Sequence, residues 1–434
     1  MIYILAPFSL SINTTSKNRI LSFYRELKAN GFEVRMLSPA VQDGDTIYLH
    51  GTRSTESIEN EDFIFLSTES TLVSRFASWL SARSKFKIIW YLLNLYYLIF
   101  KGSDLHYPVS ALNAFFTSHA LGKDDLLIAS GPPFSLFKAA ASLAAKFKCK
   151  LVLDYRDPWT YGYAPIDSRL FIDKLKTLAG RSQEDKALKI AAFVNCDSAS
   201  VKALFPKRFQ EKVNVILNGA NLSAIETDKI VDYCEVFRIV YLGTIYYDQL
   251  EDETFFACAR DFIQRNVVVP GKFEIVFVGA SKNIKLPILI KKYNLEPYTI
   301  ITHRMDIEKA MDIACTASVF LHLRYGTNTE VDTSKHLDYL ALQKWILLPV
   351  TDHGNVASSI ISNKAGYVCN NTKECMTALE DLWAIFETGG GFRIKRDQEF
   401  LYNISREAEA AKLVEIVRQH VLKEEADVAT GLLK

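Results

Sequence analysis

Two acidic residues with a lysine between them form the strongest chemical signal in the sequence. Glu330 and Asp338 are separated by seven residues, and Lys335 lies between them in EVDTSKHLDYLALQKWILLPV. Thr333 or Ser334 can cap a helix there, whose N-terminus would suit a phosphate, with the Lys335 charge beside it. Asp338, about one helical turn further on, can accept hydrogen bonds from a ribose diol. A solvated amphipathic helix explains the same pattern equally well.

Polar residues also follow the apolar segment LVLDY. Asp154 ends this predicted strand, and Arg156, Asp157 and Trp159 come after it. Pro158 biases Asp157 toward an extended conformation. Charges at the end of a buried strand are costly without partners. The segment therefore indicates either a ligand site or a structural Arg–Asp pair that caps the next element.

Further candidates stand at predicted strand ends in the second half of the chain. Gly243 in YLGTIYYDQ permits a ligand to approach the backbone closely, and Thr244 offers a hydroxyl. Arg304 follows His303 between a strand and a helix, where the two residues either contact a nucleotide or cap the helix. The turn SGPPF is predicted to be scaffold. GxGxxG and GxxxxGK are absent from the sequence, which disfavours a dehydrogenase.

Other polar patterns favour ordinary structural roles. Asp43 and Asp45 fit a DxD metal motif, but they lie in a polar loop, so a turn is predicted. The acidic run at 248–253 is predicted to be a solvated helix start. The seven cysteines lack CxxC spacing and the eight histidines lack HExxH spacing. We therefore expect buried reduced thiols and no metal site.

Length and composition set the broad class. The chain has 434 residues, of which 49% are hydrophobic, and a formal net charge of +1. This length suits two domains, and the near-neutral charge disfavours nucleic acid as a partner. The opening MIYILAPFSL lacks the basic region and cleavage site of a signal peptide, so a first buried strand and a cytoplasmic location are expected.

Short apolar strands alternate with longer helices, which predicts an α/β protein with parallel sheets. The pattern pauses near Asn218 and Gly219 and restarts at FRIVYLG. We expect one Rossmann-like domain at 1–217, a second at 218–397, and a C-terminal helix and tail at 398–434 that return to the first domain. Two such domains would face a central cleft lined by the carboxyl ends of their strands, where open α/β sheets bind ligands.

Three local features carry more detailed predictions. The polar segment at 38–69 is predicted to be irregular, as a loop or an insertion. The helix at 169–191 is predicted to break near Gly180, because glycine weakens helices. A single helix is predicted at 398–422.

The apolar segment at 88–100 has basic residues around it. It is shorter than the roughly 20 residues that a membrane-spanning helix needs. It is either a buried core helix or, with 85–101 as the contact, a helix on an anionic membrane surface. The basic residues are Arg75, Arg83, Lys85, Lys87 and Lys101.

Taken in order, these motifs resemble the retaining nucleotide-sugar glycosyltransferases of the GT-B fold, specifically glycosyltransferase family 4. LIASGPPF and LVLDYRDPWT are similar to that family's P-P-F/S turn and D-x-R-D-x-W strand end. VILNGAN resembles its VIPNGVD linker, and IVYLGTIYYDQ resembles its GTLYGG loop. SKHLDYLALQKWILLPV resembles its KLFEYLA…GKPVL helix and strand, and TTSKNRILSFYRELKANGFEV its opening loop and helix.

The resemblance implies roles on the donor side. Glu330 and Asp338 match the family's E-x7-E motif, so Glu330 would contact the donor sugar and Asp338 the ribose. Lys335 and backbone amides would contact the diphosphate, and the strand end at Arg304 would flank the base. The implied donor-binding residues are Gly243, Thr244, Arg304, Thr333, Ser334, Lys335 and Asp338.

On the other side of the expected cleft, the resemblance places Arg156 and Asp157 near the reacting sugar, where they complete a catalytic set with Glu330. Arg19, in the opening segment, would face the acceptor or the diphosphate, and Trp159 the acceptor. The family usually retains anomeric configuration and requires no metal or other cofactor.

The implied activity is transfer of a sugar from a UDP- or GDP-linked donor to a glycan or lipid-linked oligosaccharide, in bacterial surface polysaccharide synthesis. Such an enzyme would be cytoplasmic and peripheral on the inner face of the membrane. The loop after Gly243 lacks the basic residues that many members place on the diphosphate, and Asp338 is shorter than the usual glutamate. The alternatives are a non-catalytic sugar-nucleotide-binding partner of another transferase, a GT-B epimerase and a phosphorylase.

Overall fold

The computed structural model describes residues 1–12, 14–40, 61–66, 109–161, 171–326, 329 and 334–431. Side chains at 15, 171–179, 247, 334 and 421–431 are outside this description. So are Glu330, Thr333, the Asp43 to Asp45 turn and the segment 85–101.

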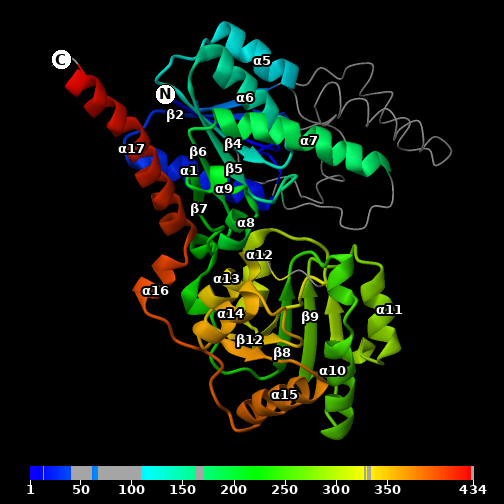
Figure 1. The fold of residues 1–434 in the computed structure, drawn as a ribbon. Helices are drawn as coiled ribbons and strands as arrows, with labels where there is room; N and C mark the ends of the chain where they lie inside the picture. Colours follow the sequence, from blue (N-terminus) through cyan, green and yellow to red (C-terminus); the bar gives the residue numbers. More distant parts are fainter. Residues whose placement is uncertain are drawn as a thin grey trace. The chain divides into compact units, whose positions relative to one another are not determined.

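The chain divides into two compact units (Figure 1). Unit 1 is Met1–Leu217 with Glu409–Lys434, and unit 2 is Asn218–Ala408. Among the described residues, no helix is long and apolar enough to cross a membrane.

The described part of unit 1 contains a seven-stranded sheet in the order β3-β2-β1-β4-β5-β6-β7. Every neighbouring pair is parallel, which confirms the α/β prediction. The strands are β1 (Ile2–Leu5), β2 (Val34–Pro39), β3 (Phe63–Leu66), β4 (Leu126–Gly131), β5 (Lys150–Tyr155), β6 (Phe193–Cys196) and β7 (Val213–Val215).

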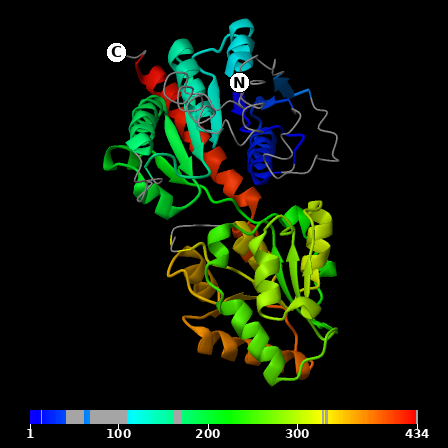
Figure 2. The same cartoon turned by 90° about the vertical axis from the view of Figure 1, so that its right-hand side faces the viewer.

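Helices cover both faces of this sheet. α1 (Thr15–Ala29) and α17 (Arg406–Gly431) bury apolar residues against one face. Figure 2 draws α17 in red. The helices on the other face are α5 (Val109–Ser118), α6 (Ser135–Phe147), α7 (Phe171–Ile190) and α8 (Ala199–Leu204), and the short α9 (Lys207–Gln210) follows them in the chain.

The described part of unit 2 contains a six-stranded parallel sheet in the order β10-β9-β8-β11-β12-β13. The strands are β8 (Phe237–Leu242), β9 (Phe273–Val278), β10 (Thr299–Ile301), β11 (Val319–Leu321), β12 (Trp345–Leu348) and β13 (Gly366–Val368). The helices α10 (Thr254–Arg265), α11 (Lys285–Lys292) and α15 (Thr372–Glu387) cover one face, and α12 (Ile307–Cys315), α13 (Ser334–Ala341) and α14 (Asn355–Ser362) the other.

Three local predictions were wrong. The segment at 38–69, predicted to be an irregular loop or insertion, contains a regular edge strand, β3, made from the apolar run FIFL. α7 continues without a break through Gly180. A Cβ at position 180 would lie 2.8 Å from Thr160 Cγ2, so the glycine permits Thr160 to pack closely on the helix. The predicted helix at 398–422 is two helices, α16 (Gln398–Asn403) and α17. Between them, Ser405 Oγ accepts from the Ala408 amide.

Cysteine burial agrees with the prediction. All seven cysteines are free thiols, and six of them are buried, with Cys234 at intermediate exposure.

Candidate functional site

In unit 2, two glycines lie in the loops that follow the neighbouring strands β8 and β9, and they connect these loops to each other and to the loop after β10. Gly243 follows β8 with φ 89°, and its N–H donates to the carbonyl of Val278 at the end of β9 at 2.8 Å. Gly279 follows β9 with φ 80°, and its N–H donates to Thr302 Oγ1, after β10, at 3.0 Å. A Cβ at Gly279 would lie 3.8 Å from both Gly243 Cα and Arg304 Cα. Left-handed glycines therefore bring the three loops together without a side chain between them.

Lys335 extends from the first turn of α13 into this edge. Its Nζ donates to the hydroxyl of Tyr241 and to the carbonyl of Thr244, the latter at 2.8 Å. Nζ also lies 4.4 Å from the Tyr241 ring centroid. A Cβ on Gly243 would approach Lys335 Cε to 3.4 Å. The predicted lysine thus contacts the backbone of the predicted threonine and lies beside the predicted glycine.

The neighbours of Lys335 give it hydrogen-bond acceptors but no counter-charge. Within the described part of the chain, no carboxylate forms an ion pair with it, and burial lowers the pKa of Lys335 to about 7. Burial also raises the pKa of Tyr241 well above its usual value, so that hydroxyl stays neutral. His322, at the end of β11, is neutral as well, because burial holds its pKa well below the usual range. An anion bound here would supply the missing negative charge.

Two side chains that the sequence reasoning missed hold this arrangement in place. Tyr339, one turn after Lys335 on α13, accepts from the Leu242 amide through its hydroxyl at 3.0 Å and stacks on Phe320 at 4.2 Å. Gln249 Oε1 accepts from the Tyr246 amide, and its Nε2 donates to the Leu323 carbonyl at 2.9 Å. The four-residue spacing between Lys335 and Tyr339 was a readable signal for the first of them.

Asp338 lies on α13 beside the chain segment that enters unit 2. Its Oδ1 accepts from the Asn221 amide at 3.0 Å. Burial raises the pKa of the Asp338 carboxyl, although the Arg406 charge and the Asn221 hydrogen bond oppose this shift. One carboxylate oxygen is therefore already bonded to the backbone, and the predicted contact with a ribose stays a prediction.

The remaining donor-side candidates are placed only in part. Arg304 and His303 are exposed after β10, and His303 Nδ1 lies 2.8 Å from Ser281 Oγ. Neither residue caps α12, because Asp306 precedes that helix. Ser334 begins α13. The Thr329 carbonyl accepts from the Asn355 amide at 3.1 Å. A Cβ on Gly354 would lie only 1.9 Å from the Thr329 carbonyl oxygen, so this position requires glycine.

In unit 1, the segment after β5 packs on the SGPPF turn after β4. The Arg156 amide donates to the Gly131 carbonyl at 3.0 Å, and its guanidinium donates to the Pro132 carbonyl. Burial lowers the pKa of Arg156 to about 10, so it stays charged at neutral pH. Asp157 is exposed beside it. The Trp159 ring stacks on Phe134 at 5.0 Å.

Helix α7 fixes the far end of that segment. Glu184 is buried and accepts from the Thr160 amide at 2.8 Å, from the Thr160 hydroxyl, and from the Tyr155 hydroxyl. Arg181 donates to the Thr160 carbonyl at 3.0 Å. The segment that carries Arg156 and Asp157 is therefore held at both ends.

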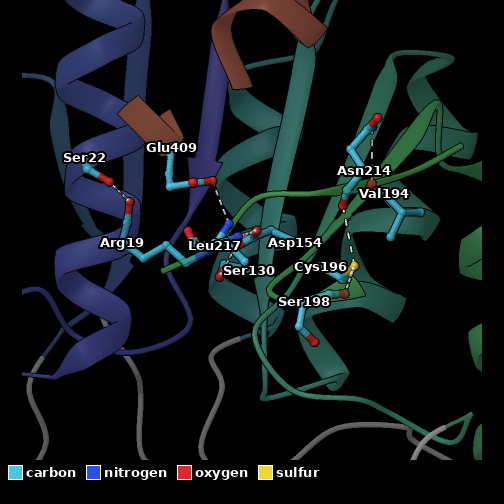
Figure 3. Close-up of polar contacts among 10 residues, drawn as sticks. All are labelled: Arg19, Ser22, Ser130, Asp154, Val194, Cys196, Ser198, Asn214, Leu217 and Glu409. Carbon is cyan, nitrogen blue, oxygen red and sulfur yellow. Dashed lines mark hydrogen bonds and ion pairs between the residues drawn. The ribbon is translucent and has the colours of Figure 1, made fainter. Parts of the chain in front are cut away.

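Arg19 belongs to a buried ion pair instead of an open surface. It is 2% exposed, and it donates to Asp154 through both Nε and Nη2, the latter at 2.8 Å (Figure 3). Ser130 donates to the same carboxylate at 2.8 Å. Arg19 Nη1 also donates to the Leu217 carbonyl at 2.8 Å. Asp154 thus pairs with Arg19 of α1, whereas Arg156 of its own segment donates to the Pro132 carbonyl, and contact of Arg19 with an acceptor stays a prediction.

No protein-family model and no curated protein sequence matches the chain. Solved structures do match it over nearly its full length. The sucrose-phosphate synthase of Thermosynechococcus elongatus has a TM-score of 0.65 at 14% identity, over 96% of this chain and 98% of that one. The UDP-GlcNAc 2-epimerase of Methanocaldococcus jannaschii has a TM-score of 0.52 at 10% identity, over 96% and 99%. An apo structure of OtsA has a TM-score of 0.59 at 11% identity, over 96% and 98%.

The chain has the GT-B fold. This GT-B chain carries the Lys335 cluster at the carboxyl edge of β8 and β9, and open α/β sheets bind ligands at such edges. The acidic run at 248–253 agrees in part with the predicted solvated helix start: Glu253 directly precedes α10 and Glu251 is exposed. Asp252 binds Arg324 at 2.8 Å and Glu253 binds Lys292, so these two carboxylates are paired. Among the residues that the structure describes, no cluster of His, Cys, Asp or Glu side chains could hold a metal ion.

Proposed function

We propose that this protein is a retaining glycosyltransferase that moves a sugar from a UDP- or GDP-linked donor to a glycan or lipid-linked oligosaccharide acceptor. The observation that supports this most is the Lys335 ammonium, held among neutral oxygens at the carboxyl edge of the second sheet of a GT-B fold. A diphosphate matches that position in charge. Solved structures of similar fold include one with UDP, a Staphylococcus aureus MnaA–UDP complex.

The proposed reaction places the donor diphosphate at Lys335 and at the backbone N–H groups after Gly243. The bond between the anomeric carbon and the phosphate oxygen breaks, a bond from the acceptor oxygen forms on the same face, and the acceptor proton passes to the leaving phosphate oxygen. Lys335 stabilises the negative charge that develops on the diphosphate. Such a scheme needs orientation and charge stabilisation, and it requires neither a protein nucleophile nor a divalent cation.

On the acceptor side, we assign Arg156 and Asp157 to the acceptor or the reacting sugar. Their segment is anchored at both ends, as a group that orients a substrate requires. Glu330 belongs to the same proposed set through the resemblance.

The test is product analysis with a panel of UDP- and GDP-linked hexoses, with and without a bacterial lipid extract that carries lipid-linked oligosaccharides. Nucleoside diphosphate release that requires both donor and extract, with the anomeric configuration of the product retained by NMR, is expected. Lys335→Met should abolish this release. Lys344→Met is the matched control, because burial also lowers the pKa of Lys344 and its Nζ also donates to a backbone carbonyl, that of Val231.

A second candidate is epimerisation of the sugar nucleotide, since several matching structures are UDP-GlcNAc 2-epimerases. It predicts an isomerised sugar nucleotide from donor alone, without acceptor. Donor binding without any turnover would instead favour a non-catalytic sugar-nucleotide-binding partner of another transferase.

A further inference from the structure

Helix α11 of unit 2 has apolar residues on the face that points away from the sheet. Its inner residues Leu286, Leu289 and Ile290 are buried in the core. On the opposite face, Ile284 is 84% exposed and Ile288 is 65% exposed. The outer face of a surface helix is usually polar, so this pair is unusual. Figure 1 shows α11 on an outer flank of unit 2.

The outer apolar residues form a helical stripe. Ile284, Pro287, Ile288 and Lys291 follow the i, i+3, i+4, i+7 spacing of one face, and all four are exposed. The first three are apolar, and the fourth ends the stripe with a positive charge. Isolated exposed apolar residues need no explanation, whereas a stripe on one helix indicates a partner.

Within the segment that carries the stripe, the charges are of one sign. The eleven residues 282–292 contain four lysines and no acidic residue. One of them, Lys292, is paired with Glu253 of the preceding loop. Lys282 and Lys291 are exposed at the two ends of the segment. A short apolar stripe with lysines at both ends is complementary to a lipid surface, where anionic headgroups cover an apolar layer of acyl chains.

We propose that the outer face of α11 docks on an anionic lipid bilayer, with Ile284 and Ile288 inserted among the headgroups and Lys282 and Lys291 at the phosphate level. This surface consists of residues other than the segment 85–101 and does not depend on the donor chemistry. It gives unit 2 its own contact with the membrane.

The test is sedimentation of the full chain with vesicles, either phosphatidylcholine alone or phosphatidylcholine with phosphatidylglycerol. The wild type should bind the anionic vesicles, and binding should weaken with salt. Ile284→Ser with Ile288→Gln should weaken it about tenfold. Serine is favoured at position 284, just before the helix, so folding should persist. Lys282→Gln with Lys291→Gln should weaken binding about tenfold as well, on anionic vesicles only.

The matched control is Val267→Ser with Ile361→Gln. These residues are 81% and 64% exposed and lie elsewhere on unit 2. The control pair should bind like the wild type. Equal binding by the control and the Ile284/Ile288 variant, or no binding by the wild type, would overturn the proposal. So would self-association of the wild type in the absence of lipid that the Ile284/Ile288 variant abolishes, because the partner would then be a second copy of the chain.

Discussion

Arg19 and Glu409 hold the same residue, Leu217, from two different helices. Arg19 of α1 donates to the Leu217 carbonyl at 2.8 Å, and Glu409 of α17 accepts from the Leu217 amide at 2.8 Å (Figure 3). Leu217 is the last residue before the chain leaves unit 1, and Glu409 is the first after it returns. The two helices therefore fix the point where the chain exits unit 1, and Asp154 beneath them holds the arginine.

Replacement of Arg19 by methionine should strongly destabilise unit 1. It would leave the Asp154 carboxylate, which is 0% exposed, without its cation, and such a loss costs about 3–5 kcal/mol. Urea unfolding followed by circular dichroism measures this. Asp154→Asn in the Arg19→Met background should recover part of the loss, since the buried charge is then gone. If Arg19→Met alone unfolds like the wild type, the ion pair does not stabilise the unit.

Glu409→Ala should destabilise the protein by about 1–2 kcal/mol, because it leaves the partly buried Leu217 amide without an acceptor. Glu415 on the same helix is the control. It forms an exposed pair with Arg418 three residues away, so Glu415→Ala should change stability by less than about 0.5 kcal/mol. Thermal unfolding of both variants compares them. Equal losses would show that Leu217 is not specifically anchored.

Two glycines with the same backbone angle separate stability from binding. Gly243 and Gly271 both have φ 89°, but only a Cβ at Gly243 would meet a neighbour, Lys335 Cε at 3.4 Å. Either alanine variant should lose about 1–2 kcal/mol of stability through backbone strain. Only Gly243→Ala should also weaken nucleotide binding, measured by calorimetry. Equal affinities for the two variants would remove Gly243 from the proposed site.

The sequence predicted the alternating fold because the periodicity of strands and helices depends on neighbouring residues. It also predicted Lys335 in the first turn of a helix, since cap preferences are local. It did not predict that Asp154 would pair with Arg19, which is 135 positions away, because nothing local specifies such a contact. Gly180 was misread for the same reason: its role depends on Thr160 from a different segment.

Nucleotide binding should weaken as pH rises above 7. Burial lowers the pKa of Lys335 to about 7, and a bound diphosphate would favour the protonated form and so raise that pKa. Binding then takes up a proton, and affinity for UDP should fall by up to about tenfold per pH unit between 7 and 9. Calorimetry in two buffers of different ionisation enthalpy measures the uptake. Affinity that does not change over this range, with no proton uptake, would contradict this role for the lysine.

The buried charge of Lys335 should also cost stability in the free protein. At pH values between 7 and the ordinary lysine pKa, the unfolded chain binds a proton that the folded chain lacks, so stability rises with pH in this window. Below pH 7 both states are protonated and the full cost of burying the charge remains. Lys335→Met should therefore stabilise the free protein at pH 7 by about 1 kcal/mol. A clear loss of stability would show that Lys335 is a structural residue.

The most direct test of the donor site is calorimetric titration of UDP and GDP into the wild type, Lys335→Met and Lys344→Met at pH 7. We predict that the wild type binds one of the two nucleotides, that Lys344→Met binds it with the same affinity, and that Lys335→Met does not bind it measurably. Unchanged affinity in Lys335→Met, or equal losses in both variants, would contradict the assignment of Lys335 to the donor diphosphate.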